Sequence, residues 1–218
     1  MMRYLILITL VCGFFSAHGQ KILSEGAVMY DVSVQTGSSQ AKMADGFDGA
    51  TAVVFIKGSQ SRTDVKSAIG NYSTIYDSKA GMGVVLREFG GQKLMIRMNR
   101  QNWADKNKKY EGISYTKTDE TKKIAGYQCQ KAIAKMADGT SFSVFYTNDV
   151  VMENKDYDAQ FKNLPGVPLE FESVDGNIRV KYTATKLSFD PVPISRFEIP
   201  RSGYREMTYD EGLKAGSR

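Results

Sequence analysis

The stretch Ala27-Val28-Met29-Tyr30-Asp31-Val32-Ser33-Val34 alternates apolar side chains with mixed ones. Successive side chains of a β-strand point to opposite faces, so this alternation predicts a strand with one buried face. A second strand is predicted at Thr51–Lys57, where Gly58-Ser59 turns the chain into a further extended stretch, Gln60–Lys66. These residues predict neighbouring antiparallel strands joined by short turns.

Extended stretches separated by turn residues continue along most of the chain. Gly, Asn and Asp, which favour tight turns, lie between many of them. We expect further strands at 72–77, 84–89, 93–98, 113–123, 127–136, 141–147, 167–174 and 178–189, and an edge strand at 197–199. About eleven short strands imply a mainly β fold, built on one large antiparallel sheet that curls rather than lies flat.

One internal segment breaks the period of two and predicts a short helix. Asn154 could cap this helix, and Pro165-Gly166 would end it. Apolar side chains at positions i, i+4 and i+7 would lie on one face and pack against the concave side of the sheet. The segment and the strand after it supply the candidate ligand-binding or packing residues Tyr157, Phe161, Leu164, Pro165, Gly166, Val167 and Leu169.

The first residues have the pattern of a secretory signal peptide. A short positive start precedes an apolar run at 4–15, and Ala17 and Gly19 are small residues just before Gln20. The run is too short to cross a bilayer as a helix, which takes about 20 residues. We expect cleavage between Gly19 and Gln20, and a single soluble domain at 20–218 with no transmembrane anchor, in the periplasm or outside the cell. Its polar tail, from about 201, is expected to be loosely ordered, with at most one helical turn near 208–213.

Cleavage would remove side chains that many catalytic and metal-binding sites require. His18 is the only histidine, and Cys12 is one of two cysteines, so the mature chain keeps Cys129 alone. Nucleophile–histidine pairs and zinc sites built from His and Cys are thereby excluded. A Gly-rich phosphate loop is also missing from the sequence. We expect a non-enzymatic protein without catalytic residues, cofactor or metal.

Cys129 has two interpretations, a buried small side chain or a free thiol beside Lys131. Free cysteine is among the most buried residue types, which favours a structural role. A nearby lysine can lower the pKa of a thiol, which would favour reactivity. An intramolecular disulfide is impossible in the mature chain, because Cys129 has no partner there.

Two pairs of carboxylates also have alternative interpretations. Asp45 and Asp48 lie in a Gly-rich loop that could loosely hold calcium, but the distal glutamate of a calcium loop is missing, so turn formation is favoured. Glu170 and Glu172 lie two apart on a predicted strand and share one face. They are either an acid/base pair or ordinary cross-strand charges, and basic residues on neighbouring strands favour the second interpretation.

Charge is unevenly distributed along the chain. Residues 87–135 carry a net charge of +7, and residues 136–178 a net charge of −6. Lysines on the wet face of strands explain the basic stretch, and they also protect sheet edges. An acidic partner or an anionic lipid headgroup is the alternative, whereas we expect no nucleic-acid partner for an exported protein.

Three segments together carry a family resemblance. Residues 55–62, 120–132 and 164–170 resemble, in order and spacing, segments of GLPGLI-type exported proteins and of a neighbouring exported family of unknown function. Asn163 replaces the first glycine of the name-giving motif and Val167-Pro168 replaces Leu-Ile, so the neighbouring family fits better. The resemblance implies a fold like that of LolA, the periplasmic lipoprotein carrier: a half-open antiparallel barrel with helices against its concave face. It also implies a structural role for Cys129, and it brings no catalytic residues.

The sequence therefore favours a binding function. A curled sheet rich in aromatic and methionine side chains could hold a lipid, lipoprotein or other apolar small molecule on its concave face. The alternative is an interaction or structural module that docks on an envelope protein through a sheet edge or its charged surface.

Overall fold

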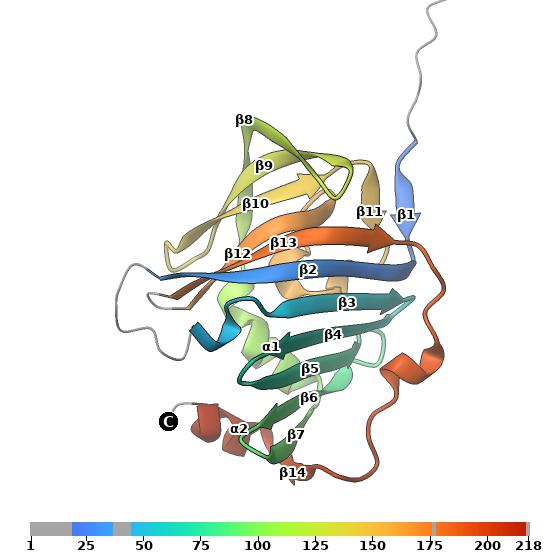
Figure 1. The fold of residues 1–218 in the computed structure, drawn as a ribbon, viewed down its shortest axis with the longest axis vertical. Helices are drawn as coiled ribbons and strands as arrows, with labels where there is room; N and C mark the ends of the chain where they lie inside the picture. Colours follow the sequence, from blue (N-terminus) through green and yellow to red (C-terminus); the bar gives the residue numbers. More distant parts are fainter. Residues whose placement is uncertain (1–18, 37–44, 176–177, 217–218) are drawn as a thin grey trace, which may run out of the picture.

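The computed structural model describes residues 19–36, 45–175 and 178–216, and within them a twelve-stranded sheet is the main element. In sheet order its strands are β14 (Arg205–Met207), β7 (Gln92–Met98), β6 (Met82–Phe89), β5 (Gly70–Asp77), β4 (Gln60–Ser67), β3 (Thr51–Lys57), β2 (Glu25–Thr36), β13 (Ile178–Ser188), β12 (Val167–Asp175), β10 (Ser141–Thr147), β9 (Tyr127–Lys135) and β8 (Ser114–Ile124). Figure 1 shows this sheet as an open, twisted layer. The expected mainly β fold with one large sheet is confirmed.

Every neighbouring pair in this sheet is antiparallel except the edge pair, because β14 runs parallel to β7. A small parallel sheet joins β1 (Lys21–Leu23) to β11 (Val150–Met152). Each strand predicted from the sequence lies within a few residues of its expected bounds, apart from the one at 197–199. The signal-peptide prediction lies outside the described residues, except for Gly19, which is exposed beside the exposed Gln20.

Two α-helices complete the described elements, α1 (Arg100–Asn107) and α2 (Tyr209–Gly216). Short 3-10 turns lie at η1 (Asp45–Phe47), η2 (Lys108–Tyr110), η3 (Lys155–Tyr157), η4 (Ala159–Phe161) and η5 (Ile194–Phe197). No helix in the described part of the chain is long and apolar enough to cross a membrane.

Alternation along the strands gives the sheet two faces. Val54 and Phe55 are consecutive on β3, so their side chains lie on opposite sides. We call the side of Val54 the inner face and the side of Phe55 the outer face. Register places Tyr30 near Val54 on the inner face, and Ile75 on the outer face, since Phe55 pairs with Arg62 and Arg62 with Ile75.

The chain after β13 covers the outer face. Val192 and Phe197 are buried there against side chains of β5, β6 and β7. Arg62 Nη1 donates a hydrogen bond to the carbonyl oxygen of Arg196 at 2.9 Å, which fastens the covering segment to β4. The expected edge strand at 197–199 is wrong, because this segment packs its side chains on the sheet instead of pairing with its edge.

Helix α1 covers part of the inner face through one side chain, Trp103. Its ring lies against Ile96 and Met98 of β7, and its centroid is 4.7 Å from that of Tyr76. Asn99 caps the helix, because its side chain accepts a hydrogen bond from Asn102 N at 2.9 Å. In Figure 1, α1 lies behind the middle strands of the sheet.

The tail after residue 201 differs from the expected loosely ordered segment. It contains β14, which extends the sheet, and α2, which is longer than the single helical turn predicted. Met207 packs beside Ile96 and Met98, so the tail contributes to the cover on the inner face of β7.

Gly166 brings the start of β12 close to β10. A Cβ atom at this position would overlap the carbonyl oxygen of Thr147, which is backbone and part of the paired strand. The glycine is thus required by the spacing between the two strands.

We predict that Gly166→Ala lowers the free energy of unfolding by about 3 kcal/mol, because the strands must move apart to accept the methyl group. Urea denaturation measures the loss. Gly112→Ala is the control: Gly112 has φ +72° and open space around its Cβ position, so it costs only the strain of a left-handed conformation, about 1 kcal/mol. Equal losses in the two variants would contradict the packing argument.

Candidate functional site

A pocket of about 170 Å³ lies between the inner face of the sheet and the η3–η4 segment. Strands β2, β3, β4, β12 and β13 form its floor, and residues 157–161 form its cover. Five aromatic side chains line it, Tyr30, Tyr157, Phe161, Phe171 and Tyr182. Aliphatic side chains such as Val54 and Val65 complete the apolar part of the wall, and Asp158 and Gln160 are its polar members at the cover.

The aromatic rings pack against one another. Phe171 stacks on Tyr182 with 4.7 Å between ring centroids, because the two residues are direct cross-strand neighbours on β12 and β13. Tyr30 meets Phe171 edge-on at 5.5 Å, and Phe161 meets Phe171 in the same manner at 4.7 Å. Such contacts hold these four rings in one orientation, so this part of the pocket wall is preformed.

The cover is not the helix that the sequence predicts. Asp158 has φ −148° and ψ 120°, an extended conformation that separates η3 from η4. Its side chain accepts a hydrogen bond from Gln160 N at 2.9 Å and so caps η4. Asn154 does not cap η3; its side chain instead bonds to Ser59 O and Ser78 Oγ, both at 3.1 Å.

Hydrogen bonds fasten this part of the chain to the sheet. Tyr115 Oη donates to the carbonyl oxygen of Gln160, and Gln160 Nε2 donates to the carbonyl oxygen of Glu172 at 3.4 Å. Tyr30 Oη donates to the carbonyl oxygen of Pro168 at 2.9 Å, at the start of β12. Two of these bonds hold η4 itself, so the cover is attached by few polar contacts.

Asp158 is the acidic group of the pocket. Burial raises the pKa of its carboxyl group, while the hydrogen bond from Gln160 N and the charges of Lys106 and Lys109 act in the opposite direction. Among the ion pairs between described residues, all with N to O distances of at most 4.0 Å, none involves Asp158. The carboxylate therefore lies at an apolar pocket without a basic side chain in direct contact.

The structure divides the candidate residues of the sequence into two groups. Tyr157 and Phe161 line the pocket. Leu164 is buried beside Phe161 in a neighbouring cluster, and Val167 and Leu169 are buried in the main core. Pro165 is exposed, and Gly166 is the point of close strand approach. The second group therefore does not line the pocket, and its buried apolar members, Leu164, Val167 and Leu169, belong to the core.

Cys129 is 1% exposed and packs in the main core with Ile124, Val150 and Met152. Burial raises the pKa of its thiol to about 11, so the thiol is protonated at neutral pH. The surroundings are those of a structural side chain.

Glu170 and Glu172 lie on the outer face and form cross-strand ion pairs, as predicted. Glu170 Oε1 is 2.6 Å from Lys122 Nζ and 3.1 Å from Lys181 Nζ, and Glu172 Oε2 is 3.2 Å from Arg179 Nη1. Burial alone would raise the pKa of Glu170, but the hydrogen bonds and charges of the two lysines lower it. A carboxylate that stays ionised in this way is a poor proton donor.

The predicted turn role of Asp48 is also observed, since its Oδ1 accepts a hydrogen bond from Val34 N at 3.1 Å. The side chain of Asp45 lies outside the described part of the structure. Among the side chains that are described, no group of three or more His, Cys, Asp or Glu residues is arranged to hold a metal ion.

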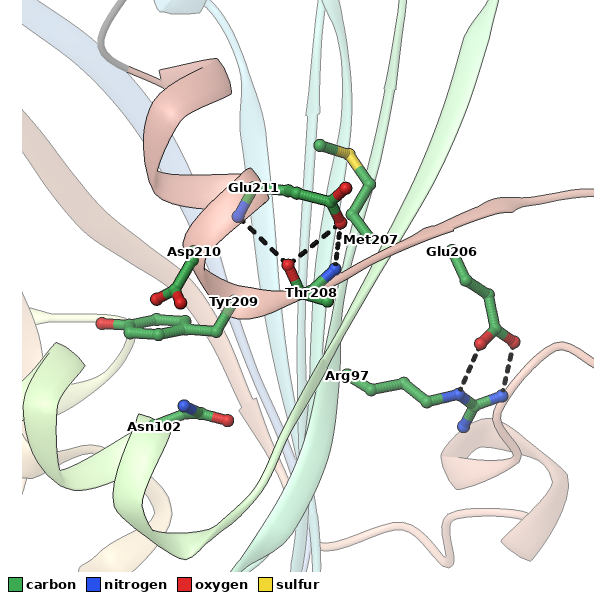
Figure 2. A pocket seen from close by; sticks show the side chains of 8 residues that line it. All are labelled: Arg97, Asn102, Glu206, Met207, Thr208, Tyr209, Asp210 and Glu211. Atoms are coloured by element: carbon green, nitrogen blue, oxygen red, sulfur yellow. Dashed lines mark hydrogen bonds and ion pairs between the residues drawn. The ribbon is translucent and has the colours of Figure 1, made fainter.

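A second hollow, of about 480 Å³, lies where the tail meets β7 (Figure 2). Arg97 donates two hydrogen bonds to Glu206, at 2.9 and 3.1 Å. Glu211 accepts a bond from Thr208 N at 2.7 Å, and Thr208 Oγ1 accepts one from Glu211 N at 3.2 Å, a reciprocal cap at the start of α2. Arg97 and Glu206 are thus paired with each other, and Glu211 is paired with Thr208. The contact between Arg97 and Glu206 anchors the tail to β7.

No protein-family model matches the chain, and no curated protein matches it in sequence. The resemblance to GLPGLI-type proteins is therefore not confirmed.

The solved structures that match the chain include the following three proteins. PNGF-II is 12% identical with a TM-score of 0.49, over 87% of this chain and 33% of that one, so this chain spans about a third of its length. MucB is 8% identical with a TM-score of 0.40, over 82% and 58% of the two chains. A β-barrel-like protein of the domain of unknown function DUF1849, from Brucella abortus, is 8% identical with a TM-score of 0.39, over 78% and 99%. At these values the likeness assigns no activity.

We predict that Cys129 reacts slowly in the folded protein. With a pKa of about 11, its thiolate fraction at pH 8 is about two hundredfold lower than that of an ordinary thiol. The rate of labelling with Ellman's reagent is compared between the folded protein in buffer and the protein unfolded in about 8 M urea. Complete labelling of the folded protein within seconds would contradict the buried thiol.

We predict that Asp158→Asn changes how stability depends on pH. The folded pKa of Asp158 is raised, so its ionisation weakens the fold as pH rises from the unfolded pKa, about 3.9, through the folded value. Asparagine keeps the cap of η4 but carries no charge. Urea denaturation across this pH range should show the variant gaining stability over the wild type as pH increases, and a constant difference would contradict the prediction.

Proposed function

We propose that this protein is an exported, non-enzymatic binding protein of the cell envelope that holds an apolar ligand on the inner face of its sheet. The observation that carries the proposal is the pocket beneath η3–η4. Five aromatic side chains from strands β2, β12 and β13 and from the cover converge on one space that they do not fill. Large apolar side chains around a few polar groups are typical of small-molecule sites.

The volume indicates what part of a ligand is held. An engineered apolar cavity of about 150 Å³ binds benzene, whereas pockets that enclose whole drug-sized ligands measure about 300–1,000 Å³. At about 170 Å³, the pocket accepts one ring or one short branched alkyl group. We propose that the rest of the ligand, such as the body of a lipid, extends beyond the cover.

The cover is the part of the wall best able to adapt. It consists of two single 3-10 turns separated by an extended residue, whereas each floor strand is paired along both edges. Short 3-10 turns have poorer hydrogen-bond geometry than longer helices, and segments with few backbone bonds open at low cost in free energy. Movement of residues 155–161 would enlarge the pocket without disturbing the sheet.

The chemistry of the chain supports binding more than catalysis. After the expected cleavage no histidine remains, and the carboxylates Glu170 and Glu172 are engaged in ion pairs on the outer face. The buried thiol of Cys129 lies in the core and does not line the pocket. Export rests on the signal-peptide pattern of residues 1–19.

We predict that Val54→Phe lowers the affinity for N-phenyl-1-naphthylamine by about tenfold or more, because the larger ring occupies the pocket. The fluorescence of this neutral dye rises on transfer to an apolar site, so titration gives the dissociation constant. Val53→Phe is the matched control, since it adds the same ring to the same strand on the outer face. Absence of dye binding to the wild-type protein, or equal loss in both variants, would overturn the proposed function.

A further inference from the structure

We propose that the group entering the pocket is an alkylated ammonium ion, such as the trimethylammonium end of a choline-type ligand. This inference rests on the proposed function and names the chemical class of its ligand. Two independent observations carry it: the rings that surround the space, and the acidic side chain at its cover.

The rings provide the surface that such a cation prefers. An ammonium group within about 6 Å of an aromatic centroid is attracted by the negative face of the ring, and clusters of several rings are the usual means of recognising quaternary ammonium ions. In this pocket, Tyr30, Phe171 and Tyr182 form one packed group, and Tyr157 and Phe161 approach from the cover. A purely aliphatic wall would hold a neutral alkyl group equally well but would give no preference for a cation.

Asp158 supplies the opposite charge. Two other carboxylates are matched by the protein's own cations, Asp156 on the cover by Lys162 at 2.7 Å and Glu170 on the outer face by Lys122 at 2.6 Å. Asp158 differs from these two, because it accepts its hydrogen bond from the backbone N–H of Gln160 and forms no ion pair with a described residue. A ligand cation would complete the charge balance at the pocket.

Two lysines act on Asp158 from a distance without occupying this place. Lys106 and Lys109 belong to α1 and η2, and their charges favour the ionised carboxylate. Their ammonium groups lie over other rings, Lys106 at 5.1 Å from the centroid of Trp103 and Lys109 at 5.0 Å from that of Tyr110. The tyrosines facing Asp158, among them Tyr157, stay neutral because burial raises their pKa values.

Size agrees with the same ligand class. The pocket volume of about 170 Å³ slightly exceeds the cavity of about 150 Å³ that accepts benzene, and a trimethylammonium group is of similar bulk. Its methyl groups would contact the rings, and its charge would lie near the carboxylate. A strongly hydrated cation such as Na⁺ would lose its water shell here without enough oxygen ligands to replace it.

The test compares choline with its neutral carbon analogue, 3,3-dimethylbutan-1-ol, by isothermal titration calorimetry on the protein lacking residues 1–19. We expect choline to bind about tenfold more tightly than the alcohol, since one well-placed charge contact of this kind accounts for such a ratio. Asp158→Asn should abolish the preference, with choline losing about tenfold in affinity relative to the alcohol. Asp156→Asn is the matched control, because it removes the neighbouring carboxylate, which pairs with Lys162, and should keep the preference.

The outcomes separate this inference from the function on which it rests. Equal affinities of the wild type for choline and the alcohol would overturn the ammonium preference and leave binding of an apolar group intact. A preference that survives in Asp158→Asn would overturn the role of the carboxylate. Failure of both probes and of the dye to bind would overturn the proposed function together with the inference.

Discussion

Both faces of the twelve-stranded sheet carry apolar side chains, and the whole architecture depends on covering them. The sheet cannot cover itself, because it does not close, so the connecting segments must do so. The chain after β13 lies on the outer face through Val192 and Phe197, while Trp103 of α1 and the η3–η4 segment lie on the inner face. The pocket is the place where this inner cover is incomplete. The pocket therefore lies where the covering segments leave part of the inner face open, and no additional structural element is needed to form it.

The conformation of Asp158 determines the character of that incomplete cover. A continuous helix from Asn154 would place apolar side chains on one face and bury them, with its acidic residues toward solvent. The extended conformation of Asp158 interrupts the segment, shortens it to two 3-10 turns and places a carboxyl group at the pocket. The break therefore produces both the empty space and its acidic side chain. Tyr157 and Phe161 still reach the sheet, so the cover retains most of the apolar contact that a helix would provide.

The strands could be predicted from the sequence because alternating burial leaves a local pattern, and the pairing of Glu170 with basic neighbours followed from the same geometry. Helix α1 could not, since Trp103 is its only buried side chain and a single contact gives no helical periodicity. Strand β14 could not be predicted for a related reason: it joins the sheet through backbone hydrogen bonds, and its sequence is mostly polar. The pocket itself required the structure, because Tyr30 and Tyr182 meet across more than a hundred residues of chain. Among the aromatic residues that line it, Tyr157 and Phe161 are the two that the sequence marked as candidates for binding or packing.

The pairing of β2 with β13 has a consequence for the order in which the protein folds. These strands are neighbours in the middle of the sheet although they lie far apart in the sequence, as the pairing of Val28 with Leu187 shows. The strands β3–β7 and β8–β10 are each close in sequence and can form early, whereas the β2–β13 pair, which joins them into one large sheet, is distant in sequence. A chain that emerges N-terminus first, from a ribosome or across a membrane, must keep one edge of β2 unpaired until β13 has followed. Protection of that waiting edge is therefore a requirement of its biogenesis.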